Sequence, residues 1–250
     1  MRHVVATQVT VQTLVFTRRK RGETLPIGRS PSLDGRTCAT FGAMKLELFY
    51  DIVSPYSYLA LTVLDRYRAP WSMELVLRPA FLGGVMKSVG NVPPATLAAR
   101  APYLMRDIGR LSSYVDVPLT LPEVFPGNTL PTMRFLCAVE DRAPARLHDV
   151  SLALFREHWG KGAAVDDPAT LVAVARAAGL DDADALVAST SEPAVKERLK
   201  KSTDEAVERG AFGFPLMFVH KNGVEEMFFG HDRLPLLAHE LGLPWHGPKP

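Results

Sequence analysis

The chain has 250 residues, of which 47 % are apolar and 22 % charged, a composition typical of a globular protein with one large domain or two small ones. Its formal net charge of +2 excludes a strongly basic nucleic-acid binder and an acidic disordered chain. No apolar run reaches the roughly 18 residues of a membrane helix, so no membrane partner is expected. With only Cys38 and Cys137, neither a disulfide-stapled fold nor a cysteine-rich zinc site is expected.

Residues 1–43 differ from the rest of the chain in charge. They carry seven Lys or Arg and two acids, whereas residues 44–250 carry 22 and 25. Because the segment is also rich in Ser and Thr, it has the composition of a mitochondrial transit peptide, and the mitochondrial matrix is the predicted location. The peroxisome and the cytoplasm are the alternatives. Residues 4–16 alternate more like a strand than an amphipathic helix, and Met44 directly precedes the first predicted strand. A misassigned start or an unfolded extension therefore explains the segment equally well.

The folded part begins with a predicted β-α-β unit. Apolar side chains alternate over residues 45–50, which predicts a short strand. Pro55 lacks an N–H and suits the first position of a helix, and apolar residues at helical spacing continue to residue 67. A second strand is predicted over residues 71–77. A unit of this length normally forms a parallel pair of strands.

A loop rich in Gly, Asn and Pro is predicted over residues 83–94. Beyond it, helices are predicted over residues 95–115, 129–141, 144–159, 168–178, 182–189 and 193–209. This stretch contains no sheet signal. It is interpreted as a large all-helical insertion.

Sheet signals return near the C-terminus. Two strands are predicted over residues 215–220 and 225–229, because Asn222–Gly223 between them is a typical hairpin turn. A last helix is predicted over residues 234–241, with Asp232 as its N-cap. The order β-α-β, helices, β-β-α predicts an α/β protein with a thioredoxin-like domain, interrupted by the all-helical domain.

This order divides the chain into three parts. Residues 44–94 and 210–250 form the predicted thioredoxin-like domain, and residues 95–209 form the inserted helical domain. Residues 1–43 are an extension outside both.

The chemistry is expected at the turn into the first helix. Thioredoxin folds place Cys-x-x-Cys there, whereas this chain has Ser54-Pro55-Tyr56-Ser57, which cannot form a disulfide. A helix N-terminus still carries unpaired N–H groups and partial positive charge, which stabilise a thiolate. Ser54 could therefore donate a hydrogen bond to the sulfur of a bound thiol. The alternative is that Ser54 only caps the helix.

A second element is the entry to the returning strand, Gly213-Phe214-Pro215. Thioredoxin folds place a cis-proline opposite the active-site turn, so the fold predicts a cis bond before Pro215. The exposed backbone of Phe214 would then pair with a bound peptide. Local sequence alone favours a trans bond.

Other candidate chemistry is weaker. The seven histidines form no ligand pair of the His-x-x-x-His kind, so no metal site is predicted, and no dinucleotide fingerprint is present. His231 as a general base is a minor alternative. Cys137 lies among apolar helical residues and is expected to be a buried thiol without a catalytic role.

Several of these motifs together resemble the kappa class of glutathione transferases. The resemblance rests on residues 46–51, 54–57, 77–79, 82–87, 90–94, 133–136, 210–215 and 229–233. These segments lie far apart and in the same order as in the family, from about residue 44 to the C-terminus. The resemblance implies a thioredoxin-like homodimer that uses glutathione as co-substrate in detoxification, with no metal.

The resemblance also implies a set of glutathione-binding residues, namely Ser54, Pro55, Tyr56, Asn91, Phe214, Pro215, His231 and Asp232. Ser54 corresponds to the family's catalytic serine, which is hydrogen-bonded to the glutathione sulfur. Phe214 would bind the cysteinyl backbone, and His231 with Asp232 would hold the γ-glutamyl end. The family often has Leu at the position of Phe214 and Ser at the position of His231, and these two departures preserve the backbone contacts.

Three functions are compatible with the sequence. The first is a glutathione transferase that conjugates the thiolate to small electrophiles. The second is a glutathione-dependent cis-trans isomerase, which resembles the bacterial 2-hydroxychromene-2-carboxylate isomerases in its Ser-Pro-Tyr turn and Gly-Asn-x-Pro-Pro loop. The third is a non-catalytic module that binds thiols or peptides. The first two differ in the electrophile pocket, which the sequence does not resolve.

Overall fold

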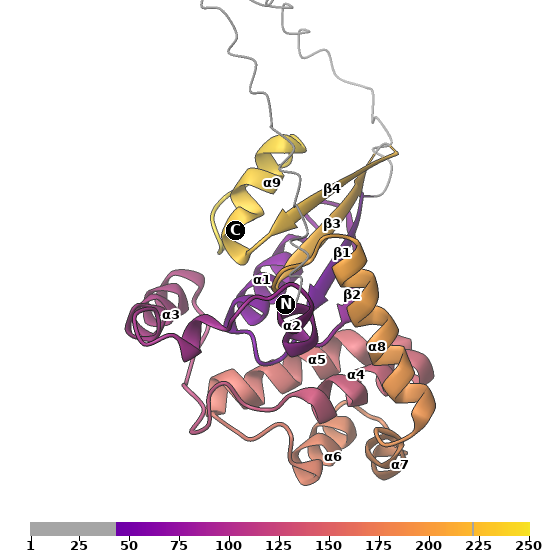
Figure 1. Ribbon diagram of the computed structural model, residues 1–250. Coiled ribbons are helices and arrows are strands. Elements are labelled where there is room, and N and C mark those ends of the chain that lie inside the picture. The colour runs from indigo at the N-terminus through magenta and orange to yellow at the C-terminus, as the bar shows by residue number, and fades with distance from the viewer. Residues whose placement is uncertain (1–43, 222) are drawn as a thin grey trace, which may run out of the picture. The chain divides into compact units, whose positions relative to one another are not determined.

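The computed structural model describes residues 44–221 and 223–250, so the predictions made for residues 1–43 lie outside this part of the chain. Its centre is a four-stranded sheet of order β2-β1-β3-β4 (Figure 1). The strands are β1 (Met44–Tyr50), β2 (Met73–Pro79), β3 (Leu216–Lys221) and β4 (Val224–Phe229). β1 and β2 are parallel, and β3 runs antiparallel to both β1 and β4. This topology confirms the predicted thioredoxin-like sheet.

The helices follow the predicted order. They are α1 (Pro55–Tyr67), α2 (Leu82–Ser88), α3 (Ala101–Val115), α4 (Leu130–Arg142), α5 (Leu147–Phe155), α6 (Pro168–Ala177), α7 (Ala183–Ser189), α8 (Pro193–Glu208) and α9 (Leu234–Glu240). α1 has the predicted bounds. A π-helical turn at Arg156–Gly160 continues α5. No helix among the described residues is long and apolar enough to cross a membrane.

Two predictions near residue 90 are wrong. The stretch assigned to a loop contains α2, and the helix expected from residue 95 begins at Ala101, after a short 3₁₀ turn at Pro94–Thr96. Gly83 and Gly84 suggested a loop, yet they lie inside α2 because of close packing. A Cβ on Gly83 would lie 2.9 Å from the Phe81 ring, and one on Gly84 would lie 3.0 Å from the Thr203 methyl group.

Each face of the sheet packs against different helices. Leu46, Leu48 and Tyr50 belong to the main core, together with buried side chains of α1 and α4. Phe49 and Phe218 lie on the other face in a smaller core that includes side chains of α2 and α8. The alternation along β1 therefore buries both faces of the sheet.

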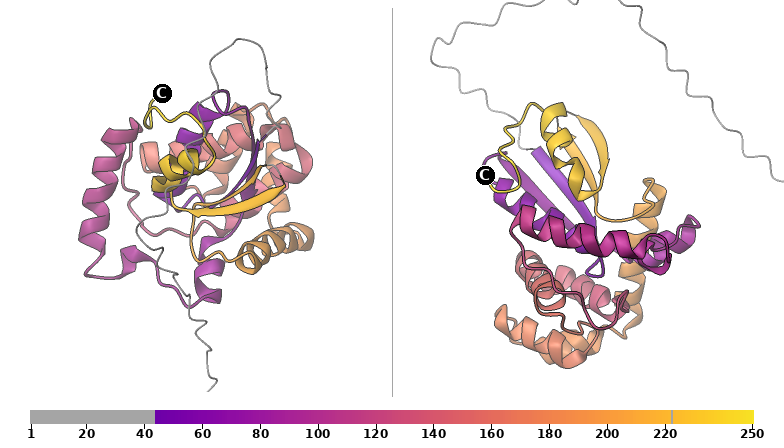
Figure 2. Two further views of the ribbon diagram at one scale, coloured as in Figure 1. Left: turned by 90° about the horizontal axis from the view of Figure 1, so that it is seen from above. Right: turned by 90° about the vertical axis from the view of Figure 1, so that its left-hand side faces the viewer.

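Helix α3 lies apart from the helices that follow it. In Figure 1, α4 to α7 gather below the sheet, whereas α3 stands to one side, and Figure 2 shows the same separation from two further directions. α8 packs against both α4 and α2, so it links the helical segment to the sheet. α3 instead lies along α1: Tyr56 contacts Asp107 at the start of α1, and the Arg66 side chain donates to the carbonyl of Val115 (2.7 Å) near its end.

The C-terminal residues pack against the C-terminal end of α1 and the turn that follows it. The Trp71 indole N–H donates to the carbonyl of Pro244 (2.8 Å), and the Tyr67 hydroxyl donates to the carbonyl of Gly247 (2.7 Å). The ring of Trp245 stacks on the ring of Tyr67, with centroids 4.9 Å apart. The tail therefore completes the main core.

Candidate functional site

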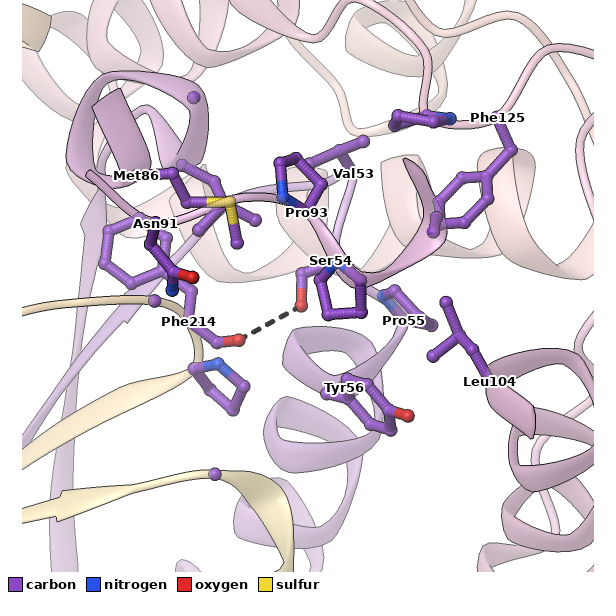
Figure 3. A pocket seen from close by; sticks show the side chains of 18 of the residues that line it. Val53, Ser54, Pro55, Tyr56, Met86, Asn91, Pro93, Leu104, Phe125 and Phe214 are labelled. Atoms are coloured by element: carbon purple, nitrogen blue, oxygen red, sulfur yellow. Dashed lines mark hydrogen bonds between the residues drawn. The ribbon is translucent and has the colours of Figure 1, made fainter. Parts of the chain in front are cut away.

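Ser54 lies at the turn between β1 and α1. Its backbone is extended (φ −93°, ψ 112°), and its Oγ accepts a hydrogen bond from the Ser57 N–H at 3.2 Å, which makes Ser54 the N-cap of α1. Pro55 follows at the first helical position, as predicted. The Ser54 hydroxyl donates to the carbonyl oxygen of Phe214 at 3.4 Å, and Figure 3 shows this contact across the site.

The two contacts of Ser54 are compatible with a third. The cap uses a lone pair of Oγ and leaves the hydroxyl proton free for another acceptor. At 3.4 Å the bond to Phe214 is longer than an ordinary O–H···O bond, which is 2.5–3.0 Å. The proton can therefore turn toward a sulfur placed between these residues. Capping the helix and binding a thiol are not exclusive roles.

The Phe214–Pro215 bond is cis, which confirms the prediction made from the fold. Phe214 is buried, and its carbonyl faces Ser54. Ser57, at the position of the second thioredoxin cysteine, is fully buried, and its Oγ has no hydrogen-bond partner among the described residues. Ser57 is therefore recessed, and Ser54 alone faces the cavity.

Asn91 connects the loop after α2 to the segment before the cis-proline through a side-chain hydrogen bond. Its Nδ2 donates to the carbonyl of Phe212 (2.8 Å), and its Oδ1 accepts from the Val92 N–H (2.8 Å). Both ends of the amide are thus bonded to backbone. Asn91 shapes the cavity wall through these contacts.

Asp232 does not cap α9, which corrects the sequence prediction. Residues His231–Arg233 form a 3₁₀ turn, and the N-cap of α9 is Arg233. The Asp232 carboxylate is exposed and accepts a hydrogen bond from Arg233 Nη1 at 2.9 Å. It also folds back over Gly230, where an added Cβ would lie 2.6 Å from Asp232 Oδ1. Gly230 has φ +98°, a backbone conformation that favours glycine.

His231 and Tyr56 form a stacked pair, with ring centroids 5.1 Å apart and an interplanar angle of 14°. Burial lowers the pKa of His231, while the carboxylates of Asp232 and Asp107 oppose that shift. The hydroxyls of Tyr56 and Tyr103 donate to the two oxygens of Asp107, each at 3.4 Å. Burial and the adjacent carboxylate of Asp107 raise the pKa of Tyr56.

One cavity of about 860 Å³ brings all eight predicted binding residues together. Its size lies in the range of small-molecule sites, and its lining is mostly apolar (Figure 3). It contains no cysteine. The charged side chains in the lining are Arg100, Asp107 and Asp232.

The sequence did not indicate Arg100, Tyr103 or Asp107 as site residues. All three lie at the start of α3 or along it, and seven residues from Arg100 to Asp107 span roughly 10 Å of helix. Their spacing could have shown that they share a helix face. Only the placement of α3 beside α1 shows that this face looks onto Ser54.

Asp51 is a further residue that the sequence did not single out. Its carboxylate is fully buried and accepts hydrogen bonds from the Thr129 hydroxyl (2.6 Å), the Val53 N–H (3.0 Å) and the Leu82 N–H (2.8 Å). Burial raises the pKa of Asp51, and these three bonds oppose the shift. Asp51 therefore ties the Ser54 turn to the first residues of α2 and α4. Its position directly after a buried strand was the available signal.

A cluster of charged side chains lies on the face of the sheet that carries Phe49 and Phe218. Glu47, His220 and Glu225 could offer ligand atoms within 4.8 Å of one another, although the sequence predicted no metal site. Arg209 Nη2 already lies 2.9 Å from Glu47 and 3.1 Å from Glu225. Burial would raise the pKa of Glu47, but hydrogen bonds from His220 and Arg209 outweigh it and lower the pKa to about 2. The cluster is therefore an ion-pair network in which the Arg209 guanidinium supplies the positive charge.

Fold and site define a class of protein: a thioredoxin-like chain with serine in place of the redox cysteines and a cavity in front of it. The sequence matches the DsbA-like thioredoxin domain over residues 45–242. Glutathione S-transferase kappa 1 of Homo sapiens is 38 % identical over 212 residues, covering 82 % of this chain and 94 % of that protein. The chain therefore belongs to the kappa-class glutathione transferases within the DsbA-like thioredoxin family, which confirms the resemblance.

The isomerases are more distant relatives. The 2-hydroxychromene-2-carboxylate isomerase of Sphingobium xenophagum is 29 % identical over 198 residues, covering 78 % of this chain and 97 % of that protein. A solved structure of a 2-hydroxychromene-2-carboxylate isomerase matches with a TM-score of 0.70 at 27 % identity, over 79 % of this chain and 94 % of that one. The likeness extends beyond the sheet to most of both chains.

Proposed function

We propose that this protein is a glutathione transferase that conjugates the thiolate of glutathione to small electrophiles. The observation that carries the proposal is the Ser54 hydroxyl at the N-terminus of α1, opposite the carbonyl of Phe214, inside a cavity that has no thiol of its own. The relatedness to glutathione S-transferase kappa 1 supports it. A site built to stabilise a thiolate needs a thiol from a ligand.

Ser54 and the helix N-terminus would lower the pKa of the bound thiol. A free alkyl thiol is only a few per cent ionised near neutral pH. A shift of about two units requires roughly 2.7 kcal/mol in favour of the thiolate. One hydrogen bond to a charged group contributes about 1.5–3 kcal/mol, and a helix N-terminus contributes about 0.3–2 kcal/mol. Together, the hydrogen bond and the helix N-terminus can supply the free energy that a shift of about two units requires.

Two of the three charged side chains in the cavity lining could pair with charged groups of glutathione. With the sulfur at Ser54, the cysteinyl backbone lies along Phe214. Asp232 would pair with the γ-glutamyl ammonium, and the Arg100 guanidinium would pair with the glycyl carboxylate, since both residues line the cavity. Such pairing orients the tripeptide before reaction.

The reaction forms no covalent bond to the protein. The thiol loses its proton to solvent, and the sulfur attacks the electrophilic carbon. With an aryl halide, a C–S bond replaces the C–halogen bond and halide leaves. The apolar wall of Leu104, Leu111, Phe125 and Pro126 holds the electrophile beside the sulfur.

An isomerase of the 2-hydroxychromene-2-carboxylate type is the second candidate function, supported by the match to that solved structure. There the thiolate would add to the substrate, a bond would rotate, and the thiolate would leave again. A thiol- or peptide-binding module without turnover is the third. One experiment separates them: glutathione binding by calorimetry, then turnover with 1-chloro-2,4-dinitrobenzene and with 2-hydroxychromene-2-carboxylate. Binding without either turnover supports the module, and absence of binding contradicts all three.

Two predictions from the sequence accompany this proposal. The mitochondrial matrix is the proposed location because of the composition of residues 1–43. A homodimer is proposed because the kappa class is expected to dimerise. Fractionation of cells that express the full chain and sedimentation equilibrium of the purified protein test the two.

A further inference from the structure

One carboxylate in the cavity has no cationic partner. Asp107 projects from α3, and its oxygens accept only the hydroxyls of Tyr56 and Tyr103, each at a long 3.4 Å. Within residues 44–221 and 223–250, no Lys, Arg or His side chain forms an ion pair with it. Asp232, by contrast, pairs with Arg233 at 2.9 Å. Asp107 therefore presents its charge to the cavity with little compensation.

Apolar side chains flank Asp107 along α3. Leu104, Asp107 and Leu111 share one face of α3, because residues spaced three and four apart lie above one another on a helix. All three line the cavity, and Phe125 and Pro126 line it as well. The charge of Asp107 acts on a second charge that enters the cavity beside it, and the strength of this interaction falls as the distance grows.

The other charged groups of the cavity do not offset Asp107 on this side. Arg100 lies about two helical turns before it and is assigned to the glycyl carboxylate. Tyr56 is neutral, and burial favours the neutral form of His231 by lowering its pKa. Asp232, the remaining charged group in the lining, is paired with Arg233 and supplies no positive charge to this side. A carboxylate on an electrophile would meet repulsion here.

We propose that Asp107 is a specificity-determining residue that restricts the electrophile half of the cavity to neutral, apolar electrophiles and discriminates against those that carry a carboxylate. The proposal rests on the proposed function, since it concerns the second substrate of that same site. Excluding a charge by an unpaired like charge is a recognised route to selectivity. It also separates the two enzymatic candidates, because the isomerase substrate is a carboxylate.

The test compares two electrophiles that react alike. In 1-chloro-2,4-dinitrobenzene and 4-chloro-3,5-dinitrobenzoate the glutathione sulfur replaces chloride, and only the second carries a carboxylate. The ratio of their kcat/KM values, each divided by the uncatalysed rate with glutathione, reports selectivity. The wild type should favour the neutral substrate. Asp107→Asn should move the ratio toward the benzoate by roughly ten-fold. High salt should shift the ratio in the wild type and not in the variant.

Asp116 provides the matched control. It is the C-cap of the same helix, exposed and outside the cavity, and its backbone (φ +59°) tolerates Asn. Asp116→Asn should leave the ratio unchanged.

Three outcomes overturn the proposal. An unchanged ratio in Asp107→Asn, with normal turnover of the neutral substrate, removes the role of Asp107 and leaves the transferase intact. A wild-type protein that prefers the benzoate also removes the role of Asp107 and leaves the transferase intact. No glutathione binding and no turnover of either substrate would contradict the proposed function and this inference with it. Asp107→Ser, which also removes the charge, repeats the measurement should Asp107→Asn fold poorly.

Discussion

At the scale of single residues, Ser54 and Ser57 have the same side chain in opposite environments. The Ser54 hydroxyl faces the cavity and has a weak bond that it can exchange, whereas Ser57 is buried with no partner. Only one of the two can meet a ligand. Substitution of each by alanine should therefore have different consequences.

Ser54→Ala should lower turnover at neutral pH and raise the pKa of the bound glutathione thiol by about one to two units, since a hydrogen bond to a charged sulfur is lost. Glutathione affinity should stay within several-fold, because the backbone and charge contacts persist. Thiolate absorbance of the complex against pH measures the shift. Loss of the cap also costs about 0.5–2 kcal/mol of stability. An unchanged thiol pKa would remove Ser54 from catalysis.

Ser57→Ala is the control for this measurement. Its Oγ is buried and has no hydrogen-bond partner, so removing it leaves no other group unsatisfied. The thiol pKa in the complex should equal that of the wild type. Equal shifts in both variants would point to a general disturbance of the start of α1.

Asp232→Asn separates recognition from thiol activation. If Asp232 pairs with the γ-glutamyl ammonium, loss of its charge should weaken glutathione binding by about 1–3 kcal/mol, while the bound thiol keeps its pKa. Since Asp232 is not the cap of α9, a weaker complex cannot come from a lost cap. Calorimetry with glutathione measures the change. A wild-type dissociation constant would exclude Asp232 from the binding site.

His231→Ser should change the pH dependence of stability. Because the folded state lowers the pKa of His231, the unfolded state binds more protons between the two pKa values, and the wild type gains stability as pH rises through that interval. The variant lacks this gain, and loss of the stacked pair with Tyr56 costs about 0.5–1.5 kcal/mol at pH 8. The difference between the two proteins should therefore be smaller at pH 5.5.

Urea unfolding at pH 5.5 and pH 8 measures this difference. His158 also has a pKa lowered by burial, so part of the wild-type slope should persist in the variant. If His231→Ser keeps the whole wild-type slope, the imidazole of His231 does not titrate as inferred.

The sequence located the residues at element ends but not those brought in by packing. Ser54 and Pro55 could be read because an N-cap and a first-turn proline are local features. The cis bond before Pro215 followed only from the fold. Arg100 and Asp107 were missed because their role depends on where α3 lies, and no local pattern encodes that position.

At the scale of secondary structure, Asp51 joins three segments of the cavity wall. Asp51→Asn would place an amide N–H₂ against a donor, since the two carboxylate oxygens accept three bonds. We expect a loss of about 1–3 kcal/mol in the free energy of unfolding and a lower kcat, because the Ser54 turn and the starts of α2 and α4 lose their common anchor. Denaturant unfolding and steady-state kinetics measure both.

Thr129→Val provides a matched comparison for Asp51. The Thr129 hydroxyl bonds Asp51 and makes no capping bond to α4. The double variant should therefore lose less stability than the sum of the two single variants. Strict additivity would show that the two side chains act independently.

Helix α2 and the turn before α9 show why element boundaries were harder to predict. Gly83 and Gly84 are typical loop residues, yet they lie inside α2, where the Phe81 ring and the Thr203 methyl group approach them closely. Asp232 is a typical N-cap residue, but its carboxylate is folded over Gly230 instead. In both cases packing contacts outweighed residue preference: the tertiary contact with Thr203 at Gly84, and local contacts at Gly83 and Asp232. α1 matched its prediction because apolar spacing, proline and cap all agreed.

At the scale of the whole molecule, α1 connects the site to the C-terminal tail. Ser54 begins the helix, and Tyr67 ends it roughly 20 Å away. Tyr67 carries both a hydrogen bond to Gly247 and the stacked ring of Trp245. The tail therefore stabilises the helix that begins at Ser54, without approaching the cavity.

Trp245→Ala should consequently reduce stability without changing the chemistry. Loss of the ring stacked on Tyr67 should cost about 2 kcal/mol, since Trp245 is only partly buried, and should lower the Tm by roughly 4–8 °C. Below the transition, kcat/KM and the bound-thiol pKa should equal those of the wild type, because Trp245 does not line the cavity. Trp245→Phe keeps an aromatic ring on Tyr67 and should recover most of the Tm. A change in the thiol pKa of the fully folded alanine variant would show that the tail reaches Ser54 through α1, and an equal loss of stability in both variants would show that stacking is not what holds the tail.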